Sequence, residues 1–392
     1  MTMFSSRTNW DLQPNRLARR VAELRVEAKE LLDLTESNPT RAGIAYLDAA
    51  WLGELSVPAA ASYDPEPRGL LAARAAVRDR YRKRGVELTA ERLFLASGTS
   101  EAYAHLFRLL LEPGEAALVP TPSYPLFDFL GDISDVALIP YSLHYDGAWW
   151  IDMDELERRI TPACRAIVLV SPNNPTGSVL SAKEGDELCR IAAAHDLALI
   201  ADEVFADFIL SPSASAAPSM AAEDRVLTFT LGGLSKSLGM PQMKVAWTAV
   251  NGPAALADEA CRRLEVLSDT FLSVNTPAQL ALPAWLARAD EARTAIMHRL
   301  KTNHRACLQS VADPVELLHV DGGWSVVLRL PATRSDEDWC LLLLEEEGVI
   351  ADPGATYGFG SGAHIVISLL TPVDTFRAGV ERIAARVSAT RQ

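Results

Sequence analysis

Short apolar runs alternate with helix-like stretches through the middle of this 392-residue chain. The runs are rich in Val, Ile, Leu and Ala, and they cover residues 92–96, 116–120, 136–140, 166–170, 197–201, 226–231 and 244–250. Segments between them, such as EAYAHLFRLLL and AKEGDELCRIAAAHD, have helical spacing. Near-continuous apolar strands that alternate with helices indicate a mostly parallel sheet with helices on both faces. We therefore predict an α/β fold built on one seven-stranded sheet.

The pattern changes on both sides of this region. Residues 15–32 and 69–84 have helical spacing, and a polar loop containing Asn38-Pro39 lies between them. After about residue 255, long helical stretches lead into short strand-like runs, which is typical of a smaller α+β domain. We predict an N-terminal arm with the start of the small domain at 1–45, a large domain at 46–280, and a small C-terminal α+β domain at 281–392.

Composition and charge limit the kinds of binding partner and the cellular compartment that we expect. The net charge of −14 and the pI near 5.0 argue against nucleic acid or an anionic membrane as main partner, but they allow a local positive pocket. The five cysteines are scattered without metal-type spacing, so we expect no metal site and a reduced, cytoplasmic environment. The N-terminal stretch has no apolar core like that of a signal peptide, and the longest apolar runs are too short to cross a bilayer.

Chemically distinctive residues follow several predicted strands, and in a parallel α/β sheet ligands bind outside the carboxyl ends of the strands. The run at 92–96 leads into Ser97-Gly98-Thr99-Ser100 and a helix, an arrangement suited to binding a phosphate. An ordinary helix cap is the alternative there. Tyr124 follows the run at 116–120 between two prolines, where packing is the alternative to ligand stacking.

The remaining strand ends supply an amide, an acid and an amine. The amide-rich turn SPNNPTG follows the run at 166–170. Asp202 directly follows the apolar run at 197–201, so its carboxylate will be partly buried and will need a partner, although a helix cap is again an alternative. Lys236 follows the run at 226–231 in a short Gly/Ser turn, where a solvent-exposed lysine is the alternative.

Together these groups fit one kind of ligand, a phosphorylated heteroaromatic aldehyde. The amine would form a Schiff base, the acid would hold a ring nitrogen protonated, the amide would bond a ring hydroxyl and the aromatic residue would stack on the ring. These are the parts expected of a site for pyridoxal 5′-phosphate (PLP).

The chain resembles the class I/II aminotransferases, which are fold-type I PLP enzymes, over nearly its whole length. The motifs SPNNPTG, ADEVFADF and GLSKSLGMPQMK occur in the order and at the spacing usual for that family. The resemblance implies a fold-type I architecture with a large α/β domain and a smaller α+β domain, and PLP as the cofactor.

The resemblance also implies roles for single residues. Lys236 would be the catalytic Schiff-base lysine, and Asp202 would pair with the pyridinium nitrogen. Tyr63 matches a tyrosine that reaches the phosphate bound by the neighbouring subunit, which implies a homodimer with shared active sites. The other implied cofactor contacts are Gly98, Thr99 and Ser100 for the phosphate, Tyr124 for ring stacking and Asn174 for the ring hydroxyl.

Several positions depart from the family pattern. Phe205 replaces a tyrosine that bonds the ring oxygen, so we expect the Schiff base to stay protonated to a higher pH than is usual in the family. Gly233 replaces a phosphate-binding serine. Lys244 replaces a phosphate-binding arginine, which keeps the charge but loses the bidentate fork.

A further departure affects the substrate. Val366 occupies the position of the arginine that holds the substrate α-carboxylate. Another cation could take over, and the nearest candidates in sequence are Arg41 and His364, with a surface role as the alternative for Arg41. A backbone and amide site at Ser37 and Asn38 would also serve, or the substrate presents no carboxylate there.

The resulting prediction is an aminotransferase that moves an amino group from an amino donor, in our expectation an amino acid, to a 2-oxo acid by way of pyridoxamine phosphate. A PLP-dependent lyase or decarboxylase on the same fold is the first alternative. A ligand-sensing domain of a transcriptional regulator is a remote one, because the residues before the first matching loop contain no helix-turn-helix pattern. The sequence leaves the amino donor open and does not support an aspartate preference.

Overall fold

The computed structural model describes residues 3–213 and 215–390. Within them, the largest sheet has eight strands in the order β2-β9-β8-β7-β6-β3-β4-β5. The strands are β2 (Leu93–Ala96), β3 (Ala116–Thr121), β4 (Ala137–Tyr145), β5 (Trp149–Ile151), β6 (Cys164–Val170), β7 (Ala198–Asp202), β8 (Thr228–Gly233) and β9 (Ala246–Asn251). The neighbours from β4 through β3, β6 and β7 to β8 run parallel, while β9 is antiparallel to both β2 and β8. The predicted mostly parallel α/β sheet is therefore confirmed.

The prediction of seven strands was wrong by one. Each of the seven apolar runs forms a strand, and β5 is an additional edge strand of three residues that pairs antiparallel with the end of β4. The run predicted at 136–140 also continues further than expected, to Tyr145. Three residues are too few to display the alternation that identifies a strand, so pairing with β4 rather than local pattern creates β5.

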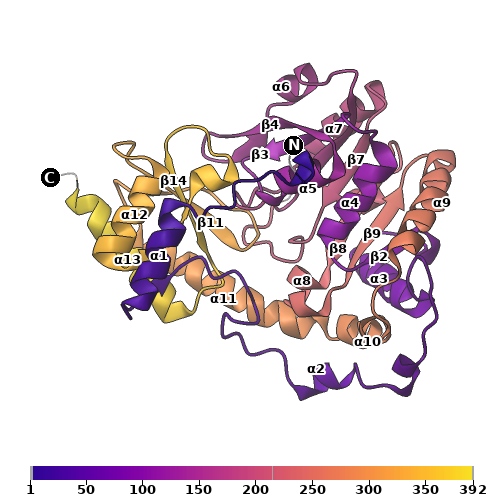
Figure 1. Ribbon diagram of the computed structural model, residues 1–392, viewed down its shortest axis with the longest axis horizontal. Helices are drawn as coiled ribbons and strands as arrows, with labels where there is room; N and C mark the ends of the chain where they lie inside the picture. The colour runs from indigo at the N-terminus through magenta and orange to yellow at the C-terminus, as the bar shows by residue number, and fades with distance from the viewer. Residues whose placement is uncertain (1–2, 214, 391–392) are drawn as a thin grey trace.

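Helices cover both faces of the large sheet (Figure 1). Ile200 packs with side chains of α4 (Thr99–Leu110), α5 (Leu126–Ser134) and α9 (Ala254–Phe271). Its neighbour Leu199 packs with side chains of α6 (Met153–Arg158) and α7 (Ala182–Ala194) on the opposite face. Adjacent strand residues point to opposite faces, so the sheet is buried on both sides and its apolar strands need no polar face. A third core lies between the β2 and β9 edge, α3 (Leu71–Lys83) and α10 (Thr276–Ala287).

A smaller sheet lies beside the large one and is drawn in orange and yellow in Figure 1. Its strand order is β10-β11-β14-β13, and β1 pairs separately with β12. The strands are β1 (Leu32–Asp33), β10 (Glu316–Leu317), β11 (Ser325–Leu330), β12 (Val349–Ile350), β13 (Asp352–Pro353) and β14 (Ala363–Ser368). The accompanying helices are α1 (Arg16–Val26), α11 (Ala289–Ser310), α12 (Asp336–Glu347) and α13 (Val373–Ala389). The predicted limits of the domains stay predictions.

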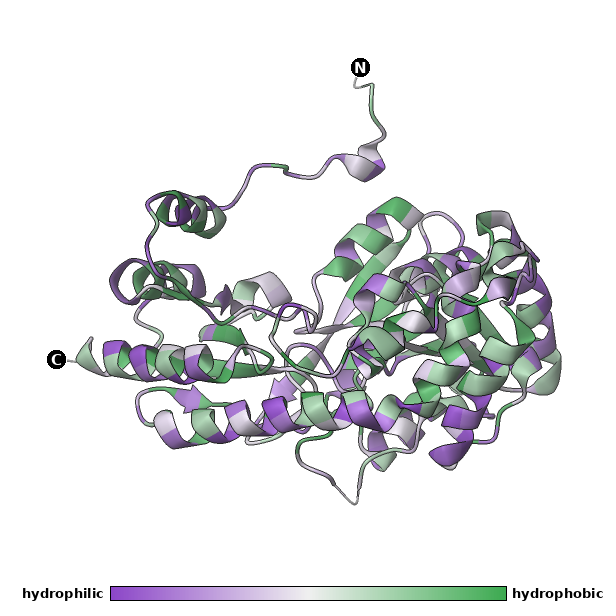
Figure 2. Ribbon diagram, turned by 90° about the horizontal axis from the view of Figure 1, so that it is seen from below, coloured by the Kyte–Doolittle hydropathy of each residue, from purple (hydrophilic) through white to green (hydrophobic). Residues whose placement is uncertain are grey.

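Short elements connect these layers. They are α2 (Ala49–Gly53), α8 (Leu234–Ser237), η1 (Ser6–Thr8), η2 (Pro58–Ala61), η3 (Ala90–Arg92), η4 (Met220–Ala222), η5 (Pro241–Met243) and η6 (Gly354–Tyr357). In the view of Figure 2 the segment before α1 runs along the outside of the molecule, and the strands are mainly hydrophobic while the outer helices carry both kinds of residue. Trp10 of that segment packs on Phe129 at a ring distance of 5.2 Å and donates to Asp132. No helix in the described part of the chain combines the length and the hydrophobicity required to cross a membrane.

Candidate active site

Lys236 lies on α8, in the turn that links β8 to the strand beside it. In Figure 1 this short helix lies between the large sheet and α11. The indole ring of Trp247 on β9 lies against Gly232, one of the two glycines that end β8, because a β-carbon there would lie only 2.5 Å from Nε1 of Trp247. Glycine is therefore required by the packing of this ring, just before the turn that carries the lysine.

Two aromatic rings flank the amino group of Lys236. The Nζ atom lies 5.5 Å from the ring centroid of Phe205 and 5.0 Å from that of Trp324. Burial lowers the pKa of Lys236, and the Asp202 carboxylate opposes part of that shift. A lowered pKa increases the fraction of neutral amine, which is the nucleophilic form. Trp324 was not identified from the sequence, and the signal for it was a tryptophan that directly follows two glycines and precedes a strand.

Asp202 is the last residue of β7 and is buried. Its Oδ1 accepts a hydrogen bond from the backbone N–H of Val204 at 3.1 Å, and its Oδ2 accepts one from the Tyr103 hydroxyl at 3.1 Å. Burial raises the pKa of Asp202 to about 6, although both hydrogen bonds and Lys236 favour the charged form. Tyr103 was missed by sequence reasoning, and its only signal was its place one turn into the helix that begins at the predicted phosphate site.

The predicted phosphate site is the N-terminus of α4, with Gly98 as the cap residue. The first N–H groups of a helix have no acceptor within the helix, so they favour an anion. Lys244 reaches this point from the far end of the α8 turn, with its Nζ 3.6 Å from where a β-carbon of Gly98 would lie. The Glu101 carboxylate already accepts a hydrogen bond from the N–H of Ser97 at 2.6 Å, which leaves Gly98, Thr99 and Ser100 as the backbone donors.

The amide and aromatic candidates lie near each other at the next strand ends. Oδ1 of Asn174 accepts a hydrogen bond from the Ser325 hydroxyl at 3.4 Å, so the amide faces β11 of the small sheet. Asn173 is buried and donates to the Ser123 hydroxyl at 3.3 Å, which joins the amide-rich turn to the loop that carries Tyr124. The Tyr124 side chain is about half exposed, at 49%.

The position of the missing carboxylate arginine is apolar. Val366 of β14 is buried and packs with Leu318 and Val327. Aromatic side chains cover this small cluster, and they are Tyr145, Trp149, Tyr357 and Phe359. His364 lies two residues earlier on the same strand, where its ring stacks on Phe359 at 4.6 Å and burial lowers its pKa.

The other substrate candidates lie on the loop that follows β1. The Arg41 side chain is 74% exposed and forms an ion pair with Glu36, with Nε to Oε2 at 3.3 Å. The Asn38 side chain accepts hydrogen bonds from the N–H and the hydroxyl of Thr40, so the loop itself uses it. Ser37 is exposed, as is Tyr63, which lies between η2 and α3.

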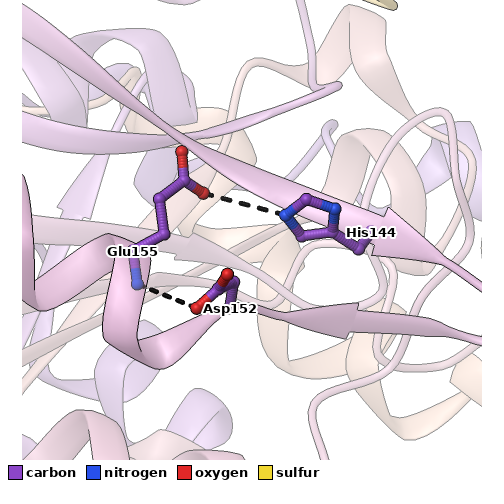
Figure 3. Close-up of side chains that lie close together, drawn as sticks. All are labelled: His144, Asp152 and Glu155. Atoms are coloured by element: carbon purple, nitrogen blue, oxygen red, sulfur yellow. Dashed lines mark hydrogen bonds and ion pairs between the residues drawn. The ribbon is translucent and has the colours of Figure 1, made fainter.

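A separate group of side chains has ligand types suited to a metal, namely His144, Asp152 and Glu155 (Figure 3). Each carboxylate already has protein partners. Asp152 caps α6 by accepting from the N–H of Glu155 at 2.8 Å, and Glu155 forms an ion pair with Arg159 at 2.6 Å. The cluster is therefore accounted for by a helix cap and an ion pair.

Comparison with known proteins shows which family and which individual proteins this chain is similar to. The family described as aminotransferase class I and II matches residues 47–383. The chain is 28% identical over 379 residues to a glutamate–pyruvate aminotransferase of Escherichia coli, covering 94% of this chain and 93% of that protein. It is 30% identical over 388 residues to an arginine–pyruvate transaminase of Pseudomonas aeruginosa, covering 96% and 93%. A crystal structure of an aminotransferase from Escherichia coli superposes with a TM-score of 0.88 at 27% identity and covers 100% of both chains.

Proposed function

Because the chain belongs to the class I and II aminotransferases, we propose that it binds PLP beside Lys236 and uses it to transfer an amino group. The observation that supports this most is the convergence of an amine, a buried acid, an amide and a helix N-terminus at one edge of the large sheet. These groups fit the cofactor chemically. Lys236 can bond its aldehyde, Asp202 its ring nitrogen, Asn174 its ring hydroxyl, and the α4 N-terminus with Lys244 its phosphate.

The reaction itself is the transfer of an amino group to a 2-oxo acid, as in the related aminotransferases. The match to this family does not favour a lyase, a decarboxylase or a sensing domain. When bound, the cofactor supplies a protonated pyridine ring that stabilises the negative charge formed when the Cα–H bond of the donor breaks. We assign to Asp202 the role of keeping that ring nitrogen protonated, and to Lys236 the removal and return of the proton by its Nζ atom.

The two aromatic rings beside Lys236 have a part in this chemistry. Phe205 and Trp324 exclude water from the amino group and keep its pKa low, so the amine can accept a proton from carbon once the donor has displaced it. Because Phe205 has no hydroxyl, it cannot bond a ring oxygen, so Asn174 alone is assigned that contact. Tyr124 is assigned to stacking on the ring.

The substrate carboxylate needs a cation in this proposal, and we assign it to Arg41. The guanidinium is mostly exposed, and among the described residues its ion pair is with Glu36 through Nε, so its two terminal nitrogens remain available for a carboxylate fork. His364 is a weaker candidate because Phe359 covers its ring. Ser37 would contribute its backbone N–H from the same loop, and Asn38 would contribute the N–H groups of its side-chain amide, because its backbone N–H already donates to Glu36 at 2.9 Å.

Assembly and location complete the proposal. We propose a homodimer in which Tyr63 of each subunit reaches the phosphate site of the other, and a cytoplasmic location. The dimer is supported by the exposure of large apolar side chains on neighbouring segments, which are Leu52, Tyr63, Leu71, Phe271 and Leu272. The reduced compartment is supported by the five cysteines, each of which is buried and free.

A spectral experiment tests the proposed function. The purified protein with PLP is mixed with amino acids and amines one at a time, and the absorbance band of the lysine-bound cofactor is followed. We expect an amino donor to convert this band into that of pyridoxamine phosphate, and a 2-oxo acid to restore it. Lys236→Ala should abolish the band, whereas Lys183→Ala, at an exposed position on α7, should leave it unchanged. A band that no amino compound converts would contradict the proposal.

A variant of Arg41 tests the assigned carboxylate contact. Loss of a charge-assisted fork costs on the order of 1.5–3 kcal/mol, so Arg41→Ala should raise KM for an amino-acid donor by about tenfold or more. The value for an amine donor without a carboxylate should stay the same, which serves as the internal control. An unchanged KM for the amino acid would remove Arg41 from the site.

A further inference from the structure

A carboxylate without a cationic partner lies in the wall of the site that the small sheet forms. Asp352 of β13 is partly buried, and its Oδ2 accepts a hydrogen bond from the Tyr357 hydroxyl at 3.1 Å. No lysine, arginine or histidine of the described residues forms an ion pair with it. By contrast, the nearby Asp33 pairs with Arg25 at 3.2 Å. Buried carboxylates are normally paired, so an unpaired one beside a binding site indicates a missing cation.

The strand register places Asp352 in the same row as the missing arginine. Val327 of β11 lies opposite Val366 of β14, and Val366 lies opposite Asp352 of β13. Residues directly opposite in antiparallel strands point to the same face of the sheet. Ser325, two residues before Val327 and therefore on that face, donates to Asn174. The row therefore belongs to the wall that faces the assigned cofactor contacts.

Aromatic rings surround this row. The ring centroids of Tyr145 and Trp149 lie 5.0 Å apart, and those of Trp149 and Phe359 lie 6.1 Å apart. The carbonyl of Tyr357 accepts a hydrogen bond from the N–H of Ser123, which fixes this ring next to the loop of the assigned stacking residue. Aromatic faces combined with a carboxylate form an environment suited to a positively charged group.

The charges near the wall argue against a donor whose side chain is negatively charged. Arg329 lies over the Tyr145 ring, with its guanidinium carbon 5.8 Å from the centroid, but its charge is already paired with Glu316. Burial and the neighbouring Asp33 raise the pKa of Asp352 to about 6, so it is mostly ionised at neutral pH and would repel a second substrate carboxylate. Bringing a cation beside Asp352 would relieve the cost of its burial.

We infer that the protein prefers an amino-acid donor with a positively charged side chain, and that this side chain binds against Asp352 and the rings of Tyr145, Trp149, Tyr357 and Phe359. The inference rests on the proposed function, in which Arg41 holds the α-carboxylate from the loop that follows β1. Val366 stands where the family has an arginine. A long cationic side chain at this position would repel such a donor, and valine does not. Asp352 is thus a substrate-binding residue that sets specificity.

L-arginine and L-citrulline provide a matched test, because they differ mainly in the charge of the terminal group. The protein with bound PLP is mixed with each amino acid, and kcat/KM for conversion of the cofactor band is measured. We expect arginine to exceed citrulline by about tenfold or more, as for a charge-assisted contact, and L-glutamate to be the poorest donor. Asp352→Asn should bring the arginine-to-citrulline ratio close to one and change the citrulline value by less than about threefold.

The control variant is Asp146→Asn, which removes an exposed carboxylate in the turn between β4 and β5 and should leave the ratio unchanged. Equal use of arginine and citrulline by the parent protein would overturn the inference without reference to any variant. Equal loss of both donors in Asp352→Asn would also overturn it. If citrulline, alanine or glutamate converts the band and arginine has no advantage, only this inference fails. If no amino compound converts the band, the proposed function fails as well.

A binding measurement separates recognition from turnover. Calorimetric titration with 5-guanidinopentanoate and 5-ureidopentanoate, which lack the reacting amino group, should show about tenfold tighter binding of the guanidino acid. Asp352→Asn should remove that difference. Equal affinity of the parent for the two acids would contradict the assigned contact.

Discussion

Asp202 carries a charge that the folded chain disfavours until a cation lies beside it. Its carboxyl group is buried, and burial raises its pKa from an ordinary 3.8 to about 6 in spite of two hydrogen bonds and the nearby lysine. A carboxylic acid with a raised pKa favours folding when protonated and opposes folding when ionised. In the proposed function a protonated ring nitrogen would offset that cost at neutral pH, and cofactor affinity would then depend on this one residue.

The Asp202→Asn variant separates the two effects. An uncharged amide keeps both contacts in a changed form, because its Oδ1 can accept from the N–H of Val204 while its Nδ2 donates to the Tyr103 hydroxyl oxygen. The contribution of the raised pKa is fully present below the ordinary value of 3.8 and is lost as pH rises through about 6, so cofactor-free parent and variant should be equally stable at about pH 3. At pH 8 the variant should be more stable by up to about 2–3 kcal/mol. Denaturant unfolding at both pH values measures this, and affinity for PLP should fall at least about tenfold.

A variant that is less stable than the parent at pH 8 would contradict this account, because it would show that the ionised form stabilises the fold. Unchanged affinity for PLP would contradict the pairing of Asp202 with the ring nitrogen. Tyr103→Phe is a useful control, since it removes one hydrogen bond to the carboxylate and keeps its charge.

At the scale of elements, the sequence pattern predicted the strands that are buried in the large sheet. It missed the strand residues whose order depends on contacts with another strand. Each apolar run became a strand because both faces of the sheet are covered, and this makes the run continuous in sequence. Strand β5 could not be predicted, since its three residues are ordered by pairing with β4. The extension of β4 to Tyr145 has the same origin, and it brings Tyr145 to the wall of the site.

The residues of the candidate site fall into the same two groups, those that the sequence predicts and those that tertiary packing brings to the site. Lys236, Asp202, Asn174 and Gly98 lie at or just after the ends of their strands, so sequence position alone made them candidates. Tyr103, Trp324 and Asp352 come from a helix interior, a turn and a two-residue strand, and only packing of the small sheet and α4 against the strand ends brings them to the site. The pairing of Asp352 with Val366 across two strands depends on register, which the sequence of either strand leaves open.

On the scale of the whole molecule, the site is assembled from segments far apart in the chain. The loop after β1 belongs to the N-terminal part, α4 and α8 belong to the large sheet, and β11, β13 and β14 belong to the small one (Figure 1). Asn174 and Ser325 meet across the two sheets. Relative movement of the sheets would therefore alter the substrate wall while leaving the cofactor contacts of the large sheet in place.

Mixing two defective variants tests whether a second subunit completes the site. Tyr63 is 67% exposed on its own chain, which suits a residue that acts in the neighbouring subunit. Lys236→Ala and Tyr63→Ala should each have little activity as homodimers. After unfolding and refolding together in equal amounts, half of the dimers should be mixed, and each should contain one site with an intact lysine and an intact tyrosine from the other chain. The expected recovery is about a quarter of the parent activity, from random pairing in a two-fold dimer. If Tyr63 serves its own subunit, no intact site can form, and activity would stay at the level of the separate variants.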